Sequence, residues 1–348
     1  MITKPTVLIL GAGASMNYGF PSGLQLKAMI CKAIQERTDI FNDLKKVEGN
    51  EDRMNYVEDF YNNLLLSSEL SIDAFLEHNP GYFEIGRRAI ANVLLRKEKH
   101  EELFDTWIDK WLDPENKDKH WYQLLFSKLD APFGDFEKND LTIITFNYDR
   151  SLEYFLWEGM KAKYSDQDVL SALQKLRSIS VIHVYGKLGD LPVYDSNGPF
   201  VQYDLFGSGE GRQWQEYVHD ASQSIFTVHQ AEEMEEVIIK AQESLLRAAR
   251  IYFLGFGYDK INMERLFIRD CPNTERWNLL TQESLGSKCW GTAMGVSPHQ
   301  KLYLGNFGLP HMKTDYVRES RGETDQPRNF PDSTIYDFLY YNPNSKLD

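Results

Sequence analysis

The stretch that decides the fold is Val7-Leu8-Ile9-Leu10-Gly11-Ala12-Gly13-Ala14-Ser15. Its first four residues are apolar on both faces, which predicts a buried strand of the kind found in parallel sheets. The two glycines predict a turn where the backbone comes close to another group. A helical pattern begins after Ser22, which forms a capping box with Gln25. Strand, small-residue turn and helix in this order are typical of α/β domains that bind phosphates through backbone N–H groups.

The composition limits the class of protein. The chain has 348 residues, of which 42% are hydrophobic, so it can form one large domain or two of ordinary size. Its net charge of −14 repels a phosphate backbone, which makes direct nucleic-acid binding an unfavourable interpretation. The three cysteines are far apart and form no paired motif, which favours a reducing cytoplasm. We expect no signal peptide and no membrane span, because no apolar run is long enough.

Hydrophobic patterning predicts a Rossmann-like parallel sheet interrupted by a helical insertion. Residues 1–38 and 140–315 form the nucleotide-binding domain in this interpretation, and residues 316–348 form a polar C-terminal tail. Residues 39–139 contain several amphipathic helical patterns but few strand-like runs. They could pack on the sheet as ordinary α/β helices, but the lack of strands between them favours a helical subdomain.

Further strands are predicted at residues 141–146, 179–184 and 251–254, and a late one at 289–294. Asn147, His183 and Gly255 lie at the ends of the first three. Because ligands of open parallel sheets bind outside the carboxyl ends of the strands, these ends are the candidate site.

Two common nucleotide-binding chemistries fit this sequence poorly. The dinucleotide fingerprint of dehydrogenases requires a third glycine where Met16 stands, and the acidic candidates Glu36 and Asp39 do not end a second strand. A phosphate-binding loop of kinases and ATPases requires a glycine-lysine pair that the chain lacks.

Four segments together resemble the NAD-binding signature of sirtuins. They are Gly11-Ala12-Gly13-Ala14-Ser15 followed by Gly19-Phe20-Pro21, then Thr145-Phe146-Asn147-Tyr148-Asp149, His183-Val184-Tyr185-Gly186 and Gly255-Phe256-Gly257. Order and spacing agree over about a third of the chain. The resemblance implies that the first segment with Pro21, together with Tyr185 and the Gly255 turn, binds NAD, and that Asn147, Asp149 and His183 act in catalysis.

Several departures from the sirtuin pattern indicate a particular branch. Ser22-Gly23-Leu24 replaces the Asp-Phe-Arg of deacylases, Tyr185 stands where the family places its histidine, and no paired cysteines exist for a zinc ribbon. These features are similar to the sirtuin-like NAD-degrading effectors of bacterial anti-phage systems. The resemblance implies an NAD+ glycohydrolase of abortive infection, without zinc, activated by self-assembly or by a partner ATPase or nucleic-acid sensor.

The chemistry of NAD cleavage suits the named residues. Nicotinamide leaves without protonation, so the protein must hold the ribose, exclude bulk water and place one water. Asn147 is expected to position that water or the ribose, and Asp149 to bind a ribose hydroxyl or orient the loop. His183 is the candidate general base, since positions i and i+2 of a strand share a face with Tyr185.

Other interpretations of the same residues stay open. Asn147 could be a turn residue, Asp149 a helix N-cap and His183 a core histidine. The alternative functions are a sirtuin-type protein deacylase, a non-catalytic subunit that binds NAD or ADP-ribose, and a nuclease subunit. The first requires the missing zinc ribbon, and the last requires a clustered metal-binding motif that the sequence lacks.

Overall fold

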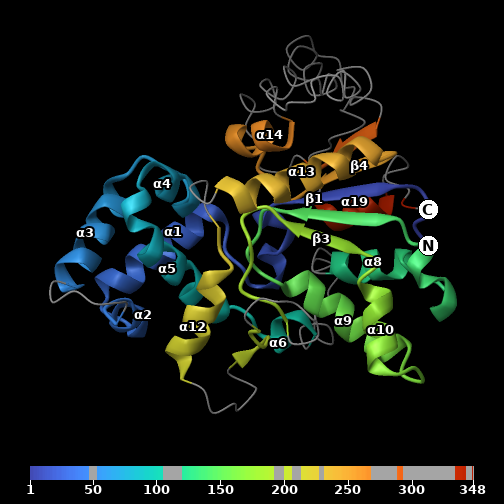
Figure 1. The fold of residues 1–348 in the computed structure, drawn as a ribbon, viewed down its shortest axis with the longest axis horizontal. Helices are drawn as coiled ribbons and strands as arrows, with labels where there is room; N and C mark the ends of the chain where they lie inside the picture. The colour runs from blue at the N-terminus through green and yellow to red at the C-terminus, as the bar shows by residue number, and fades with distance from the viewer. Residues whose placement is uncertain are drawn as a thin grey trace, which may run out of the picture.

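Parallel strands form the sheet at the centre of the computed structural model (Figure 1), which describes residues 1–46, 53–104, 120–191, 200–205, 213–226, 231–267, 288–292, 334–341 and 347. In this part of the chain the sheet has five strands in the order β3-β2-β1-β4-β5. Their bounds are β1 (Thr6–Leu10), β2 (Leu141–Thr145), β3 (Ser180–His183), β4 (Arg250–Leu254) and β5 (Cys289–Gly291). Each lies in a segment where a strand is predicted, so the α/β fold with a Rossmann-like parallel sheet is confirmed.

Strand β1 holds the sheet together because it pairs on both sides. Ile9 lies opposite Ile144 of β2 and Phe253 of β4, and all three are fully buried. This explains why the run at residues 7–10 is apolar on both faces. The chain moves from β1 to β2 and β3 on one side and then returns to β4 on the other. The strand order therefore reverses between β1 and β4, and ligands of such sheets bind at this kind of position.

Helices α1 to α5, with α12, form a group beyond the carboxyl ends of the strands (Figure 1). Helix α1 contacts α2, α3, α4 and α5, and α12 contacts α5. The bounds are α1 (Gly23–Gln35), α2 (Asp39–Leu44), α3 (Arg53–Leu66), α4 (Ile72–His78), α5 (Phe83–Leu95) and α12 (Trp214–Gln223). Helix α1 begins with the predicted capping box, in which the Ser22 hydroxyl accepts from the N–H of Gln25 and the Gln25 side chain accepts from the N–H of Ser22.

The described residues of the predicted insertion form helices, and these do not all join the group around α1. The second half of the segment contributes α8 (Trp121–Lys128), which packs against α9 (Ser151–Lys163) and α19 (Ile335–Tyr341). The remaining described helices are α6 (His100–Leu103), α10 (Val169–Leu176), α13 (Ala231–Arg247) and α14 (Lys260–Phe267). Short 3-10 helices are η1 (Ala12–Ala14), η2 (Met16–Tyr18), η3 (Pro80–Tyr82) and η5 (Phe133–Lys138).

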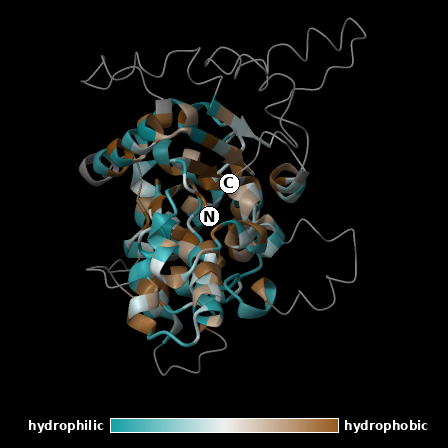
Figure 2. Cartoon of the chain, turned by 90° about the vertical axis from the view of Figure 1, so that its right-hand side faces the viewer, coloured by the Kyte–Doolittle hydropathy of each residue, from teal (hydrophilic) through white to brown (hydrophobic). Residues whose placement is uncertain are grey.

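Hydrophobic residues of strands and helices join in one buried core cluster. Figure 2 shows hydrophobic and hydrophilic residues alternating along the helices, as expected when one face packs inward and the other meets water. In α10, for example, Leu173 and Leu176 are buried while Leu170 is 73% exposed. No helix among the described residues is long and apolar enough to cross a membrane.

The C-terminal segment contains a structured element. Most of residues 316–348, predicted as a tail, lie outside the described residues, and so do residues 293–315 of the predicted NAD-binding domain. Within the described part, α19 buries Phe338 and Leu339, and the Phe338 ring packs against Tyr252 of β4 at 6.1 Å. Ile335, Phe338 and Leu339 of α19 therefore belong to the core.

Candidate functional site

The turns that follow β1 and β4 are in direct backbone contact. The N–H of Gly13 donates to the carbonyl of Gly255 at 2.9 Å. Gly255 has a φ of +58°, and a Cβ there would lie 2.3 Å from the nitrogen of Ala14. A Cβ on Gly11 would lie 2.7 Å from the Gly255 oxygen. Glycines are required here because the two turns approach each other closely. The group that the sequence analysis left unidentified is therefore the backbone of Gly255.

Most of the backbone N–H groups that were predicted to bind a diphosphate already donate hydrogen bonds to carbonyl groups of the protein. The N–H of Ala12 has no hydrogen-bond acceptor among the described residues, so an anion at this turn would meet that one donor. The other four N–H groups of residues 11–15 donate within the protein: Gly11 to Leu254, Gly13 to Gly255, Ala14 to Gly11 and Ser15 to Ala12.

The side chain of Asn147 crosses from the end of β2 to the turn after β1. Its Nδ2 donates to the Gly11 carbonyl at 3.0 Å and to the Ser15 hydroxyl at 3.2 Å. Its backbone N–H donates to Oγ1 of Thr145, which fixes the start of the loop. Both amide hydrogens are therefore used to hold the β1 turn, and Oδ1 accepts no hydrogen bond from the described residues. An acceptor in this position suits a water or a sugar hydroxyl.

Asp149, two residues after Asn147, is buried and lies in the same network. Its Oδ1 accepts hydrogen bonds from the backbone N–H, at 3.2 Å, and the hydroxyl of Ser151. Burial raises the pKa of Asp149, and hydrogen bonds with the side chains of Ser151 and Ser15 offset part of that rise. Helix α9 has Arg150 as its N-cap, one residue after the cap predicted at Asp149. These hydrogen bonds hold the carboxylate at the first residue of α9, and the two roles predicted for Asp149, binding a ribose hydroxyl or orienting the loop, stay predictions.

A buried tyrosine extends the network on the far side of Ser151. The hydroxyl of Tyr122 lies 2.7 Å from Ser151 Oγ, and the Tyr122 ring stacks on Tyr18 with 3.9 Å between centroids. The neighbouring Trp121 donates its indole N–H to the carbonyl of Ala14 at 2.8 Å. Helix α8, which belongs to the predicted insertion, therefore helps to hold the turn after β1 through this hydrogen bond to Ala14.

His183 is held at both ring nitrogens. Nδ1 lies 2.9 Å from the backbone carbonyl of Asn147, and Nε2 lies 2.7 Å from Oε1 of Glu153. The side chains of His183 and Glu153 are 5% and 7% exposed. In this arrangement no ring nitrogen is directed to a substrate, so the geometry favours a positioning role over the predicted general base.

Glu153 was not singled out from the sequence, although a signal existed. It lies on α9 at helical spacing from Leu156, Trp157 and Met160, and all four residues are buried. A carboxylate on an apolar helix face requires a partner inside the protein. That partner is His183.

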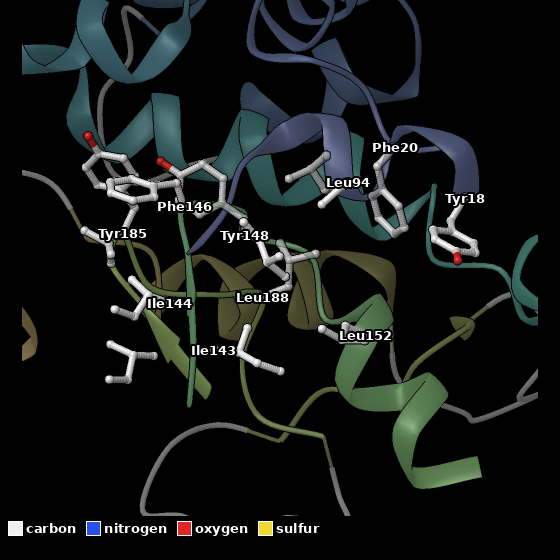
Figure 3. Packing of buried hydrophobic residues seen from close by; sticks show 14 of the residues in the cluster. Tyr18, Phe20, Leu94, Ile143, Ile144, Phe146, Tyr148, Leu152, Tyr185 and Leu188 are labelled. Atoms are coloured by element: carbon white, nitrogen blue, oxygen red, sulfur yellow. The ribbon is translucent and has the colours of Figure 1, made fainter. Parts of the chain in front are cut away.

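Tyr185 belongs to a different cluster. Strand β3 ends at His183, so the two residues no longer alternate as on a strand, and the backbone turns at Gly186 with a φ of +75°. Figure 3 shows Tyr185 beside Phe146 and Tyr148 at the ends of β2 and β3, with ring centroids 5.7 Å and 6.4 Å away.

Charged residues of α4 and α14 surround the tyrosines. The Tyr185 hydroxyl donates to Asn262 and accepts from Arg265, whose guanidinium also pairs with Glu77 of α4 at 3.1 Å. Tyr148 donates to Asp73, also on α4. We call this set of residues (Tyr148, Tyr185, Asn262, Arg265, Asp73 and Glu77) the α4–α14 bridge, because it joins those helices across the strand ends.

The remaining predicted binding residues are distributed around the two clusters. Phe256 is buried and packs against Phe146 at 5.2 Å, so it contributes to the core. A Cβ on Gly257 would meet nothing within 4 Å, and Pro21 is half-buried at the start of α1. A surface hollow of about 480 Å³ lies elsewhere, between α1, α2 and α5. No group of three or more potential metal ligands occurs within the described ranges.

No protein-family model, curated protein or solved structure matches this chain. The resemblance to sirtuins therefore remains an inference from the four motifs. The structure adds that three of the motifs meet at the strand-order reversal, through Asn147, Gly11, Ser15 and Gly255.

Proposed function

We propose that this chain is a sirtuin-like NAD+ glycohydrolase, which cleaves NAD+ to nicotinamide and ADP-ribose. The observation that carries the proposal is the position of Asn147. Its amide joins the ends of β1 and β2, next to the reversal of strand order between β1 and β4, and Oδ1 is left as an acceptor. A fixed, uncharged acceptor at this place suits the ribose or the attacking water of a glycosidic cleavage.

The proposed reaction is a hydrolysis at C1′ of the nicotinamide ribose. The bond between C1′ and the nicotinamide nitrogen breaks, and nicotinamide leaves as a neutral molecule with the bonding electrons. The water oxygen bonds to C1′ of an oxocarbenium-like sugar and releases its proton to solvent. Asn147 Oδ1 orients the ribose or the water, and the N–H of Ala12 faces the diphosphate. Because both nitrogens of His183 are engaged, the mechanism uses no base at that residue.

The biological setting follows from the resemblance alone. We propose an abortive-infection effector in the cytoplasm that becomes active on assembly, either with itself or with a partner ATPase or nucleic-acid-sensing protein. The group formed by α1 to α5 and α12, with the loop between α3 and α4, contributes exposed apolar side chains, such as Leu66, at 83% exposure, and Leu70, at 74%. We therefore expect assembly to involve this group, and replacing both leucines with serine should weaken self-association in sedimentation experiments.

The function is tested by nicotinamide release from NAD+, measured on purified protein and in cells challenged with phage. Asn147→Ala removes the acceptor and frees the β1 turn, so we expect a loss of about 100-fold or more. Asn42→Ala, an exposed position on α2, is the matched control and should retain the wild-type rate. Robust turnover by the Asn147→Ala variant would contradict the assignment.

A second candidate, a non-catalytic subunit that binds NAD or ADP-ribose, is favoured by the engagement of both nitrogens of His183. Such a protein should bind NAD+ in calorimetry and release no nicotinamide, even when assembled. Binding that is lost in Asn147→Ala, with no turnover by the wild type under any condition, would favour this candidate over the hydrolase.

A further inference from the structure

The contacts of His183 determine its protonation. The backbone carbonyl of Asn147 can only accept a hydrogen bond, so Nδ1 of His183, at 2.9 Å, must carry a proton. Nε2 faces a carboxylate oxygen of Glu153 at 2.7 Å, and a carboxylate also only accepts. When Glu153 is ionised, both nitrogens face acceptors, which is the arrangement that suits a doubly protonated, cationic ring.

The surroundings are consistent with a charged pair. Both side chains are almost fully buried, and a buried carboxylate is stable only when it is paired and hydrogen-bonded. Burial acts to raise the pKa of Glu153, but the charge and hydrogen bond of His183, with Lys187 further off, more than offset it and lower the pKa. The other charged groups that act on Glu153 are Asp149 and Glu98, and Glu98 is paired with Arg150.

The pair is connected directly to the residue that carries the proposed function. His183 donates to the carbonyl of Asn147, and the side chain of Asn147 donates to Gly11 and Ser15. Removing the carboxylate leaves neutral histidine free to place its single proton on either nitrogen. If the proton is on Nε2, the bare Nδ1 opposes the Asn147 carbonyl and the hydrogen bond is lost.

We propose that Glu153 is a positioning residue that keeps His183 doubly protonated, so that His183 fixes the main chain of Asn147 and hence the direction of its amide. The effect on catalysis rests on the proposed NAD+ hydrolysis, whereas the protonation state of His183 does not depend on it. We call the hydrogen-bonded pair of His183 and Glu153 the clamp, because it holds the main chain of Asn147 in place.

The first experiment measures the protonation of His183 by nitrogen-15 NMR of histidine-labelled protein, with His183→Gln to assign the signal. In the wild type we expect the shifts of a doubly protonated ring at pH 7. In Glu153→Gln the amide can donate to Nε2, so the ring becomes neutral with its proton retained on Nδ1. Glu158→Gln, at a partly exposed position on the same helix, is the matched control and should behave like wild type. A singly protonated His183 in the wild type would overturn the inference, and this state is measured on the wild-type protein itself.

The second experiment measures kcat and KM of nicotinamide release at pH 7 by wild type, Glu153→Ala and Glu153→Gln. Glu153→Gln should retain kcat within about threefold, because its amide can donate to Nε2 and leave the proton of Nδ1 on the Asn147 carbonyl. Glu153→Ala should lose about 10- to 100-fold in kcat with a smaller change in KM. An equal loss of kcat in the two variants would contradict the positioning role. Doubly protonated His183 with no NAD+ turnover would instead contradict the proposed function and leave the clamp supported.

Discussion

The network around Asn147 and the α4–α14 bridge occupy adjacent strand ends, but they are held by different kinds of interaction. The network joins residues that follow β1 and β2, which are paired neighbours in the sheet, and its links at Gly11 and Ser15 are neutral hydrogen bonds. The bridge joins α4 to α14 through the partly buried ion pair of Glu77 and Arg265, and neither helix belongs to the sheet.

This difference indicates how firmly each region is held in place. Sheet pairing fixes the relative position of β1 and β2, so the network is preorganised before any ligand binds. The bridge relies on long charged side chains of two helices, so we expect its contacts to be easier to separate than those of the network. The predictions below test this contrast between a fixed network and a separable bridge.

The largest expected effect is at the glycine contact that supports the fixed network. Gly255→Ala forces a residue with a side chain into a φ of +58° and places its Cβ 2.3 Å from Ala14 N. We expect a loss of at least about 3 kcal/mol in the free energy of unfolding, measured by chemical denaturation. Gly257→Ala, two residues away and with open space around it, should be within about 1 kcal/mol of wild type. Equal stabilities for the two variants would show that the turns do not depend on this contact.

A smaller effect is expected at the bridge. In a double-mutant cycle of Arg265→Gln and Glu77→Gln, we expect a coupling of about 1–2 kcal/mol that weakens with added salt, because the pair is only partly shielded from water. The pair of Lys260 and Glu264 on the same helix is 66% and 46% exposed at 3.8 Å, and its coupling should be below about 0.5 kcal/mol. A salt-independent coupling at Arg265, or one no larger than that of the control pair, would mean that the bridge is not held by charge.

The two regions also differ in how far the sequence predicts them. The run at residues 7–10 predicts a buried strand, because burial on both faces leaves a continuous apolar signal. Asn147, Ser15 and Asp149 follow from the motifs, since residues at the ends of neighbouring parallel strands must meet. Their convergence is therefore predictable from local patterns plus the topology of an α/β sheet.

The bridge and the clamp were not predictable in the same way. Glu77 and Arg265 are 188 positions apart, and no local pattern indicates that α4 and α14 face each other. The prediction that His183 and Tyr185 share a face assumes that the strand continues to Tyr185, but β3 ends at His183. The glycines of residues 11–13 indicated a close approach without identifying the partner, which is the backbone of Gly255. Tertiary packing decides these features.

The smallest expected effect concerns the stability cost of the buried carboxylate in the fixed network. Burial raises the pKa of Asp149 in the folded protein above its value of about 3.9 in the unfolded chain. Between these two values the folded state binds more protons, so Asp149 makes the protein less stable as the pH rises above about 4. Asp149→Asn should remove this loss, with a slope difference of at most about 1.4 kcal/mol per pH unit. Asp130, whose pKa the hydrogen bond and charge of Lys163 lower, gives a control of opposite sign, because its contribution is present above about pH 4 and lost on acidification. If Asp149→Asn and wild type show parallel stability curves from pH 4 to 8, the carboxylate is not desolvated, and the network is more open to water than its hydrogen bonds indicate.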